Sequence, residues 1–312
     1  FILEENLIHK QINHLLKVSV YKRLMSDRPI GCFLSGGLDS SLVTALVYKK
    51  NPNIHCFSIG LDNGVDILAA KKVVEFLNIP KERHHIVHFT IEDGFQALRD
   101  VIYHLESYDV TTIRASTPQY LLSKYISQNT DIKVLYSGEG ADELFAGYQY
   151  SKLAPSAEAL EEDSENLLKE LYMFDNLRVD RTTAGFGLEV RIPFLDPELV
   201  NYMRRIPAEY RMCSTKKIEK KVLRDSFNRD NILPMDILYR RKEAFSDAVS
   251  SNDVSWYQTL CEKYIEPNIS NLDLENAKQK YTFNPPQTKE ALYYRRIFEE
   301  LFPNKQNVIS RY

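Results

Sequence analysis

The chain has 312 residues, 44% of them hydrophobic and 27% charged, and its formal net charge is −3. This size allows one large domain or two closely packed lobes. The near-balanced charge argues against nucleic-acid binding, which usually needs a basic domain. No apolar run approaches the ~20 residues that span a bilayer, and the N-terminus lacks the charge pattern of a secretory signal. We expect a cytoplasmic protein with no membrane segment and no nucleic-acid partner.

Apolar runs and helical patterns alternate in the first half of the chain. The expected helices cover residues 3–26, 40–50 (with Asp39 or Ser40 as N-cap), 66–77, a stretch from Thr90 or Asp93, and 116–127. The expected strands cover residues 30–34, 55–61, 84–89 and 133–137. This alternation predicts an α/β fold, a parallel sheet with helices on both faces.

The pattern changes after Tyr148, where helical periodicity continues through residues 156–188 and 198–312. We therefore expect an α/β core over residues 27–150 and a mostly helical lobe over residues 151–312, with a hinge at residues 154–156. Glycine-bearing turns follow two of the strands, at residues 35–37 and 138–140. Because ligands bind beyond the carboxyl ends of parallel strands, both turns should lie on the binding edge of the sheet.

The first motif is S-G-G-L-D-S-S at residues 35–41, between a strand and a helix. Gly36 and Gly37 let the backbone turn sharply and approach a ligand closely. Successive backbone N–H groups and the helix N-terminus then form an anion site. An ordinary tight turn is the alternative interpretation, but the whole seven-residue pattern favours a phosphate-binding loop.

This loop differs from the Walker loop because no lysine follows its glycines. An acid, Asp39, lies in the loop instead. Since a carboxylate repels a polyphosphate unless a cation lies between them, Asp39 implies Mg²⁺. The loop resembles the PP-loop of the N-type ATP pyrophosphatases, which cleave ATP between the α and β phosphates.

The second motif is S-G-E-G-A-D-E-L-F-A-G-Y at residues 137–148. Ser137 and Gly138 are small enough to approach an adenosine. Asp142 can share a cation with Asp39, and Glu139 between two glycines can serve as a general base. A solvated acidic turn is the alternative interpretation, and the presence of the first motif makes it the less favoured one.

The two motifs together resemble the synthetase domain of the glutamine-hydrolysing asparagine synthetases. Further similar stretches lie at residues 111–116 (T-T-I-R-A-S), 188–196 (L-E-V-R-I-P-F-L-D), 218–224 (I-E-K-K-V-L-R) and 241–247 (R-K-E-A-F-S-D). The resemblance runs from about residue 3 to the C-terminus and implies a single synthetase domain.

The resemblance implies a role for each matching residue. The implied nucleotide contacts are Leu34, Ser35, Gly36, Gly37, Asp39, Ser40, Ile59, Ser137 and Gly138. Asp39 and Asp142 would bind Mg²⁺. Glu139 would act in forming or aminating the acyl adenylate, and Lys242 would stabilise the departing pyrophosphate. Arg114 and Thr112 are candidates for contact with the substrate.

The implied reaction is the ATP-dependent amidation of L-aspartate to L-asparagine through β-aspartyl-AMP, releasing AMP and pyrophosphate. Ammonia would come from glutamine hydrolysis in an N-terminal glutaminase domain, which needs a cysteine as first residue. Residue 1 is Phe1, and none of Cys32, Cys56, Cys213 and Cys261 replaces that cysteine. We therefore expect this chain alone to depend on free ammonia. The resemblance also allows a homodimer.

Three alternatives stay open: another acyl-adenylating amide ligase of the same fold (β-lactam synthetase-like), a tRNA-modifying relative, and a non-catalytic relative. The charge balance argues against the tRNA-modifying relative. The presence of Asp39, Glu139 and Asp142 argues against the non-catalytic relative. Two further groups favour structural roles. Asp180, Arg181, Arg191 and Asp196 suggest an ion-pair network, and His84, His85 and His88 lie on a strand where packing is more common than metal binding.

Overall fold

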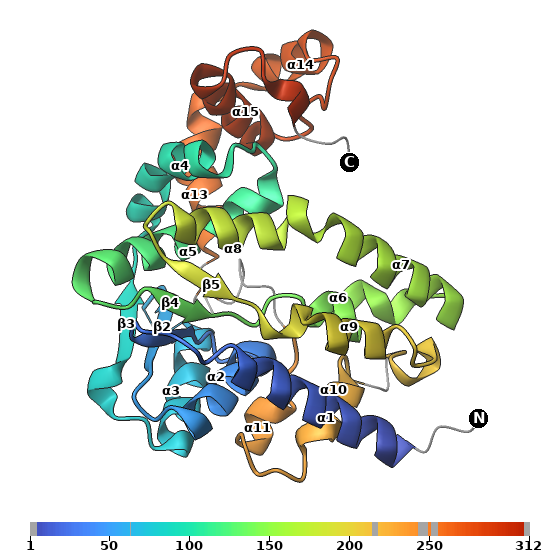
Figure 1. The fold of residues 1–312 in the computed structure, drawn as a ribbon. Coiled ribbons are helices and arrows are strands. Elements are labelled where there is room, and N and C mark those ends of the chain that lie inside the picture. Colours follow the sequence, from blue (N-terminus) through green and yellow to red (C-terminus); the bar gives the residue numbers. More distant parts are fainter. Residues whose placement is uncertain (1–4, 63, 214–217, 243–248, 251–254, 309–312) are drawn as a thin grey trace.

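The computed structural model describes residues 5–62, 64–213, 218–242, 249–250 and 255–308 (Figure 1). Its centre is a five-stranded parallel sheet with the strand order β3-β2-β1-β4-β5. The strands are β1 (Ile30–Phe33), β2 (His55–Gly60), β3 (His84–His88), β4 (Val134–Tyr136) and β5 (Glu189–Arg191). The four predicted strands are confirmed. The fifth was not predicted, since three residues are too few to show a periodic pattern.

Side chains on the two faces of the sheet enter two separate hydrophobic clusters. Cys56 packs into one cluster and the adjacent Phe57 into the other, as successive residues of a strand must. The first cluster is shared with α1 (Glu5–Lys22), α2 (Leu38–Lys50) and α3 (Val65–Leu77). The second is shared with α4 (Ile91–Leu105) and α5 (Val110–Asn129). Helices therefore cover both faces, and the predicted fold class is confirmed (Figure 1).

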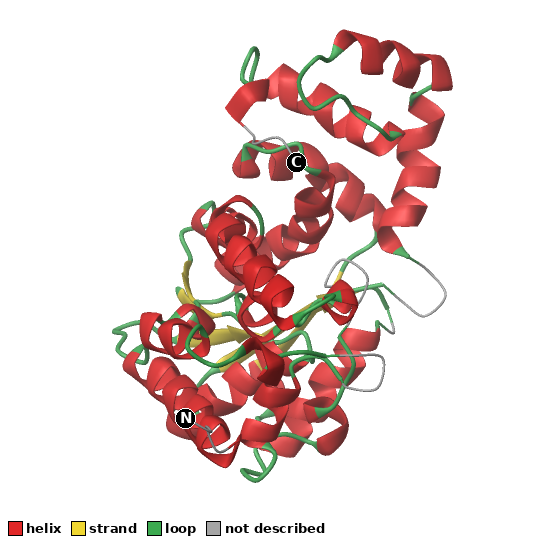
Figure 2. Cartoon of the chain, turned by 90° about the vertical axis from the view of Figure 1, so that its right-hand side faces the viewer, coloured by secondary structure: helices red, strands yellow, loops and turns green. Residues whose placement is uncertain are grey.

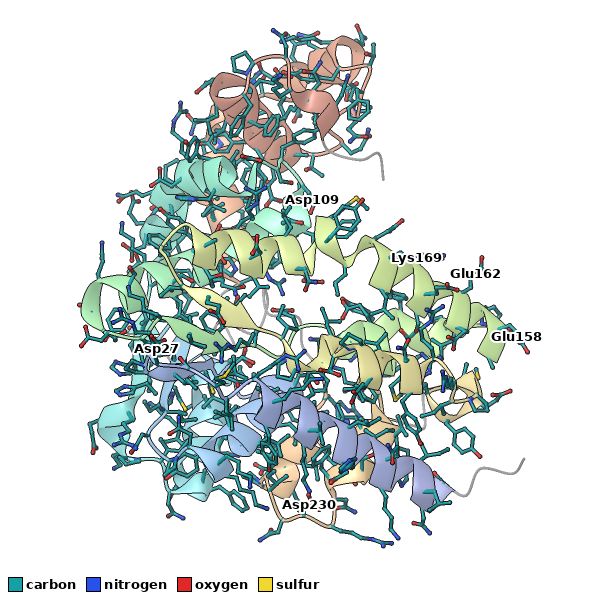
Figure 3. The ribbon with its side chains drawn as sticks, viewed as in Figure 1. Asp27, Asp109, Glu158, Glu162, Lys169 and Asp230 are labelled. Carbon is teal, nitrogen blue, oxygen red and sulfur yellow. The ribbon has the colours of Figure 1, made fainter. Side chains whose placement is uncertain are left out.

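The helix starts test the predictions made from local sequence. Of the two predicted starts of α4, Thr90 is the N-cap, and it forms a capping box with Asp93. The predicted cap of α2 was wrong, because Gly37 occupies the N-cap and Asp39 lies within the first turn. Helix α5 begins at Val110, earlier than residue 116, and Asp109 caps it by accepting from Thr112 N at 2.7 Å (Figure 3).

The second half of the chain is mostly helical (Figure 1), and helices dominate the molecule as a whole (Figure 2). Its helices are α6 (Ala141–Phe145), α7 (Ala157–Glu170), α8 (Asp175–Ala184), α9 (Pro197–Met203), α10 (Lys221–Phe227), α11 (Met235–Leu238), α13 (Trp256–Leu260), α14 (Asn271–Lys280) and α15 (Lys289–Leu301), with a π-helical turn at Cys261–Ile265. Helices α13 and α15 pack on α4, whereas α9 and α10 return to α1. The division at residue 150 stays a prediction, but β5 joins the sheet from beyond it.

Helix α7 extends from the body of the molecule and is amphipathic. Leu160 and Ser164 are buried, while Glu158, Glu162 and Lys169 are exposed and lie along its outer side (Figure 3). None of the helices in the described ranges combines the length and the apolar character needed to cross a membrane.

The ion-pair network expected in the second half is not formed as predicted. Asp196 pairs with Lys22, the last residue of α1, at 2.5 Å and with Arg23, the next residue, at 2.6 Å. Arg191 pairs with its neighbour Glu189, and Arg181 pairs with Glu106. These residues therefore fasten α1 and α4 to the second half rather than pairing with one another.

The histidines of β3 bind side chains, as the packing interpretation expected. His84 Nε2 lies 2.9 Å from Ser58 Oγ, and His85 Nε2 lies 2.9 Å from His55 Nδ1. His88 Nδ1 lies 2.9 Å from Asp62. The described residues contain no group of three or more His, Cys, Asp or Glu side chains arranged for a metal ion.

Candidate active site

A cavity of about 610 Å³ opens at the carboxyl ends of β1, β2 and β4. Its volume is typical of a site for a nucleotide-sized ligand. Most of the residues predicted for the site line it: Leu34, Ser35, Gly37, Asp39, Ser40, Ile59, Thr112, Ser137, Gly138, Glu139, Asp142 and Lys242.

The two motif loops touch at this edge of the sheet, as expected from their positions after β1 and β4. A Cβ atom on Gly138 would lie 2.8 Å from Ser40 N and 2.9 Å from the carbonyl carbon of Asp39. No side chain fits there, so the contact of the two loops requires glycine. Gly36 lies beneath the loop at φ +78° and packs against the α3 backbone, which explains why it does not line the cavity.

Serine hydroxyls hold the first loop in shape. Ser40 Oγ accepts from Ser35 N at 3.2 Å and lies 2.9 Å from Ser35 Oγ. Ser35 Oγ accepts from Gly37 N at 3.3 Å. Because Ser40 is engaged across the loop, it does not cap α2. The loop is thus closed on itself at the cavity wall.

Two lysines and two aspartates meet where the loops touch. Lys220 Nζ lies 2.5 Å from Asp39 Oδ2 and 2.7 Å from Asp142 Oδ1. Lys242 Nζ lies 2.8 Å from Asp142 Oδ2. Burial opposes the charge on Asp142, but the two lysines hold its pKa well below the ordinary value. Burial likewise opposes the charge on Lys242, and Asp142 and Asp39 outweigh it and raise the pKa of Lys242.

A second cluster, richer in acids, lies beside the first. Arg178 of α8 pairs with Glu139 at 2.8 Å and with Asp175 at 2.6 Å. Tyr148 donates to Glu143, and its hydroxyl lies 3.3 Å from Asp175. Burial raises the pKa of Glu139 against the effect of Arg178. Burial, together with Asp175 and Asp142, raises the pKa of Glu143 to about 7.

Of the two candidate substrate contacts on α5, only Thr112 reaches the cavity. Arg114 points to a separate hollow of about 430 Å³. There it forms a two-bond pair with the buried Glu290, one bond being 2.8 Å from Nε to Oε1, and its guanidinium lies 4.2 Å from the Tyr257 ring centroid. The structure therefore does not bring Arg114 to the other predicted residues.

The oxygen atoms between the loops suit a magnesium ion. Asp39 Oδ1 is buried and has no hydrogen-bond partner. A single ammonium group, that of Lys220, already bridges Asp39 and Asp142, so one cation can contact both carboxylates. Mg²⁺ is usually held by one or two carboxylates together with substrate phosphates. The residues present therefore fit the ion, with Lys220 occupying the cation position.

Comparison with known proteins identifies the family. The family model "Asparagine synthase" matches residues 11–162 and 151–311. The chain belongs to the asparagine synthase family. It is 50% identical over 311 residues to an asparagine synthetase [glutamine-hydrolyzing] of Gallus gallus, and 48% identical over 307 residues to a probable one of Acanthamoeba polyphaga mimivirus. Both matches cover 98% of this chain and 54% of the relative, so the chain spans about half the length of these curated relatives.

Two solved structures are also similar, an NMN synthetase of Francisella tularensis and an NH3-dependent NAD synthetase of Campylobacter jejuni. Each shares 18% identity with a TM-score of 0.31. They cover 65% and 67% of this chain, and 93% and 95% of their own chains, respectively. A score this low adds nothing to the fold described above.

The family resemblance seen in the sequence is thus confirmed, but sequence reasoning missed part of the site. Lys220 was overlooked, although it lies in the I-E-K-K-V-L-R stretch that carries the resemblance. Arg178, Asp175, Glu143 and Tyr148 were also missed as site residues. Glu143 and Tyr148 lie in the second motif, and their spacing there was the available signal. Arg178 and Asp175 lie on α8, where nothing in the local sequence distinguishes them from a solvated helix face.

Proposed function

We propose that this chain carries out the ATP-dependent amidation of L-aspartate to L-asparagine through β-aspartyl-AMP, releasing AMP and pyrophosphate. The observation that carries the proposal is the pairing of two unlike clusters in one cavity of an asparagine synthase family member. In one cluster, two lysines form ion pairs with Asp39 and Asp142 next to a glycine turn. In the other, Arg178 pairs with Glu139 and Asp175, and Glu143 lies beside them and accepts from Tyr148.

The first cluster suits a polyphosphate. The loop over residues 35–41 and the N-terminus of α2 would receive the phosphates. Asp39 and Asp142 would hold Mg²⁺, which supplies charge neutralisation between the phosphates and the carboxylates. Lys220 and Lys242, which pair with these aspartates, would contact phosphate oxygens. They supply the positive charge that a Walker lysine gives elsewhere.

The second cluster suits an amino acid that carries both charges. Glu143 and Asp175 offer carboxyl groups to an α-ammonium group, and Arg178 offers donors to a carboxylate. Aspartate bound there would direct its β-carboxylate towards the phosphates. One oxygen of that carboxylate attacks the α-phosphorus and pyrophosphate leaves. A free carboxylate has no leaving group for amide formation, and adenylation supplies AMP as one.

Ammonia then attacks the acyl carbon and AMP departs with the bonding electrons. The nitrogen must lose a proton in this step, and Glu139 is the proposed acceptor. Its pKa is raised by burial, which makes it a better base than an ordinary glutamate. The surrounding cavity would limit hydrolysis of the adenylate by excluding water.

The test is isotope exchange between pyrophosphate and ATP, which reports adenylation without amide formation. We expect exchange that requires both Mg²⁺ and aspartate, and asparagine formation on addition of ammonia. A β-lactam synthetase-like ligase is the alternative. Exchange that ignores aspartate but responds to another carboxylic acid would replace the proposal with that alternative.

We also propose that these 312 residues on their own use ammonia rather than glutamine. Burial raises the pKa of all four thiols: those of Cys32 and Cys213 rise, and those of Cys56 and Cys261 reach about 12. A glutaminase needs an activated thiolate, and burial works against one. Glutamine is therefore expected to support no synthesis where ammonium chloride does. Equal rates with both would contradict this.

A further inference from the structure

We propose that Glu219 is a positioning residue that sets Lys242 at the phosphate end of the cavity. Glu219 is fully buried at 0% exposure and is not among the residues that line the cavity. It therefore cannot touch a ligand, and its influence must pass through its neighbours. The inference rests on the function proposed above, since Lys242 is assigned there to the phosphates.

One oxygen of Glu219 carries the argument. Oε1 accepts from the backbone N–H of Lys242 at 2.7 Å and from Arg224 Nη2 at 2.8 Å. Arg224, itself 1% exposed, also donates to the Glu219 carbonyl at 2.8 Å and to the Leu238 carbonyl at 2.6 Å. The arginine thus fixes the carboxylate, and the carboxylate fixes the Lys242 amide.

Lys242 needs such an anchor because it lies in neither a helix nor a strand. Within the described part of the chain, its backbone takes part in no helix or strand hydrogen-bond ladder. Its N–H is held by Glu219, and its carbonyl accepts from Gln149 Nε2 at 3.0 Å. Side chains from two distant segments therefore determine where Lys242 Nζ meets Asp142.

Lys220 provides an internal contrast. It adjoins Glu219, but its carbonyl accepts from Leu223 N and Arg224 N at 3.0 Å each, so the first turn of α10 fixes its backbone. The loss of the Glu219 side chain should therefore displace Lys242 more than Lys220. This separates a specific positioning role from a general loosening of the site.

The experiment compares ATP binding by calorimetry, with Mg²⁺ present, in Glu219→Ala and Glu219→Gln. We expect the alanine variant to bind ATP about tenfold more weakly, as befits one displaced charged contact. Glutamine keeps an acceptor for the Lys242 amide and should stay within about twofold of the original protein. Equal weakening in both variants would overturn the positioning role, because the charge and not the anchor would then matter.

A matched control and a double variant exclude a purely structural role. Asp196→Ala removes another buried, ion-paired carboxylate that does not line the cavity, and it should lower thermal stability without changing ATP affinity. On a Lys242→Ala background, Glu219→Ala should cost less than about twofold in ATP affinity, since its target is gone. A further tenfold loss on that background would contradict the inference.

The outcomes also separate this inference from the proposed function. If the original protein binds no ATP, the proposed function fails. If it binds ATP and Glu219→Ala binds equally well, only the role of Glu219 fails.

Discussion

Asp142 and Glu143 are neighbours in sequence, and both carboxyl groups are buried, yet their pKa values move in opposite directions. The pKa of Asp142 falls well below the ordinary value, whereas that of Glu143 rises to about 7. Both side chains start on α6, one facing the lysine cluster and the other facing Tyr148 and Asp175. Burial opposes ionisation in both, so the difference comes from the partners.

The lesson is that the balance of charges decides what each end of the cavity can hold. Lys220 and Lys242 face Asp39 and Asp142, and the charges match. Under the proposed function, Mg²⁺ held by the two aspartates would balance the charge of the added phosphates. At the other end Arg178 pairs with Glu139 and Asp175, and Glu143 accepts from Tyr148 beside them, so carboxyl groups predominate there. The ammonium group of an amino acid would pair with them.

The acid-rich end should respond most strongly to the loss of its base. In Glu139→Gln the proton acceptor is removed while its size is kept, and we expect asparagine synthesis to fall about 10³-fold. Steady-state asparagine formation from ammonia measures the effect. Glu189→Gln, an exposed glutamate paired with Arg191, is the matched control and should keep the original rate. An unchanged rate in Glu139→Gln would remove the base from the mechanism.

The lysine end should respond to the loss of Lys242. We expect Lys242→Ala to lower aspartate-dependent pyrophosphate exchange by about 10²-fold, the typical cost of removing one donor that stabilises a transition state. Lys169→Ala on the exposed side of α7 serves as control and should leave exchange intact (Figure 3). If both variants exchange equally well, the departing pyrophosphate does not depend on Lys242.

These two ends differ in how far the sequence revealed them. The phosphate end is encoded in contiguous stretches of sequence, because a strand followed by a glycine turn and a helix predicts an anion site. Asp39, Asp142 and the contact of the two loops were therefore predictable. Residues 243–247, which carry part of the family resemblance, lie outside the described residues. Lys220 was missed because its partners Asp39 and Asp142 lie on distant segments, and its own backbone is in the αL region at φ 55°, which the local sequence does not predict.

The acid-rich end is assembled from residues far apart in the chain, and tertiary packing decides it. Arg178 and Asp175 lie on α8, and the packing of that helix against α4, α5 and β5 brings them to Glu139. Arg114 shows the reverse error. Its motif suggested contact with substrate, but Arg114 lies two residues past Thr112, about 200° around the helix, so its side chain turns away from the cavity and towards Glu290. Periodicity alone does not tell which face of α5 meets the cavity.

The raised pKa of Glu143 predicts a pH-dependent term in stability. A carboxyl group whose pKa rises from 4.5 in the unfolded chain to about 7 when folded stabilises the fold below pH 4.5. That contribution is lost as the pH rises through 7. Glu143→Gln should therefore gain up to about 3 kcal/mol relative to the original protein between these limits, at about 1.4 kcal/mol per pKa unit. Urea unfolding at several pH values measures it, and a difference independent of pH would contradict it.

The smallest expected effect concerns the substrate that the acid-rich end would hold. Binding an ammonium group favours ionised Glu143, so Glu143→Gln should raise the KM for aspartate about tenfold, the loss of one charged hydrogen bond. The KM for ATP should change less than twofold, because the lysines assigned to the phosphates pair with Asp39 and Asp142. The exposed Glu162→Gln is the control and should change neither constant (Figure 3). Equal changes in both KM values would mean that the two ends act as one site. A cluster that binds only the amino acid should not change the KM for ATP as much as the KM for aspartate.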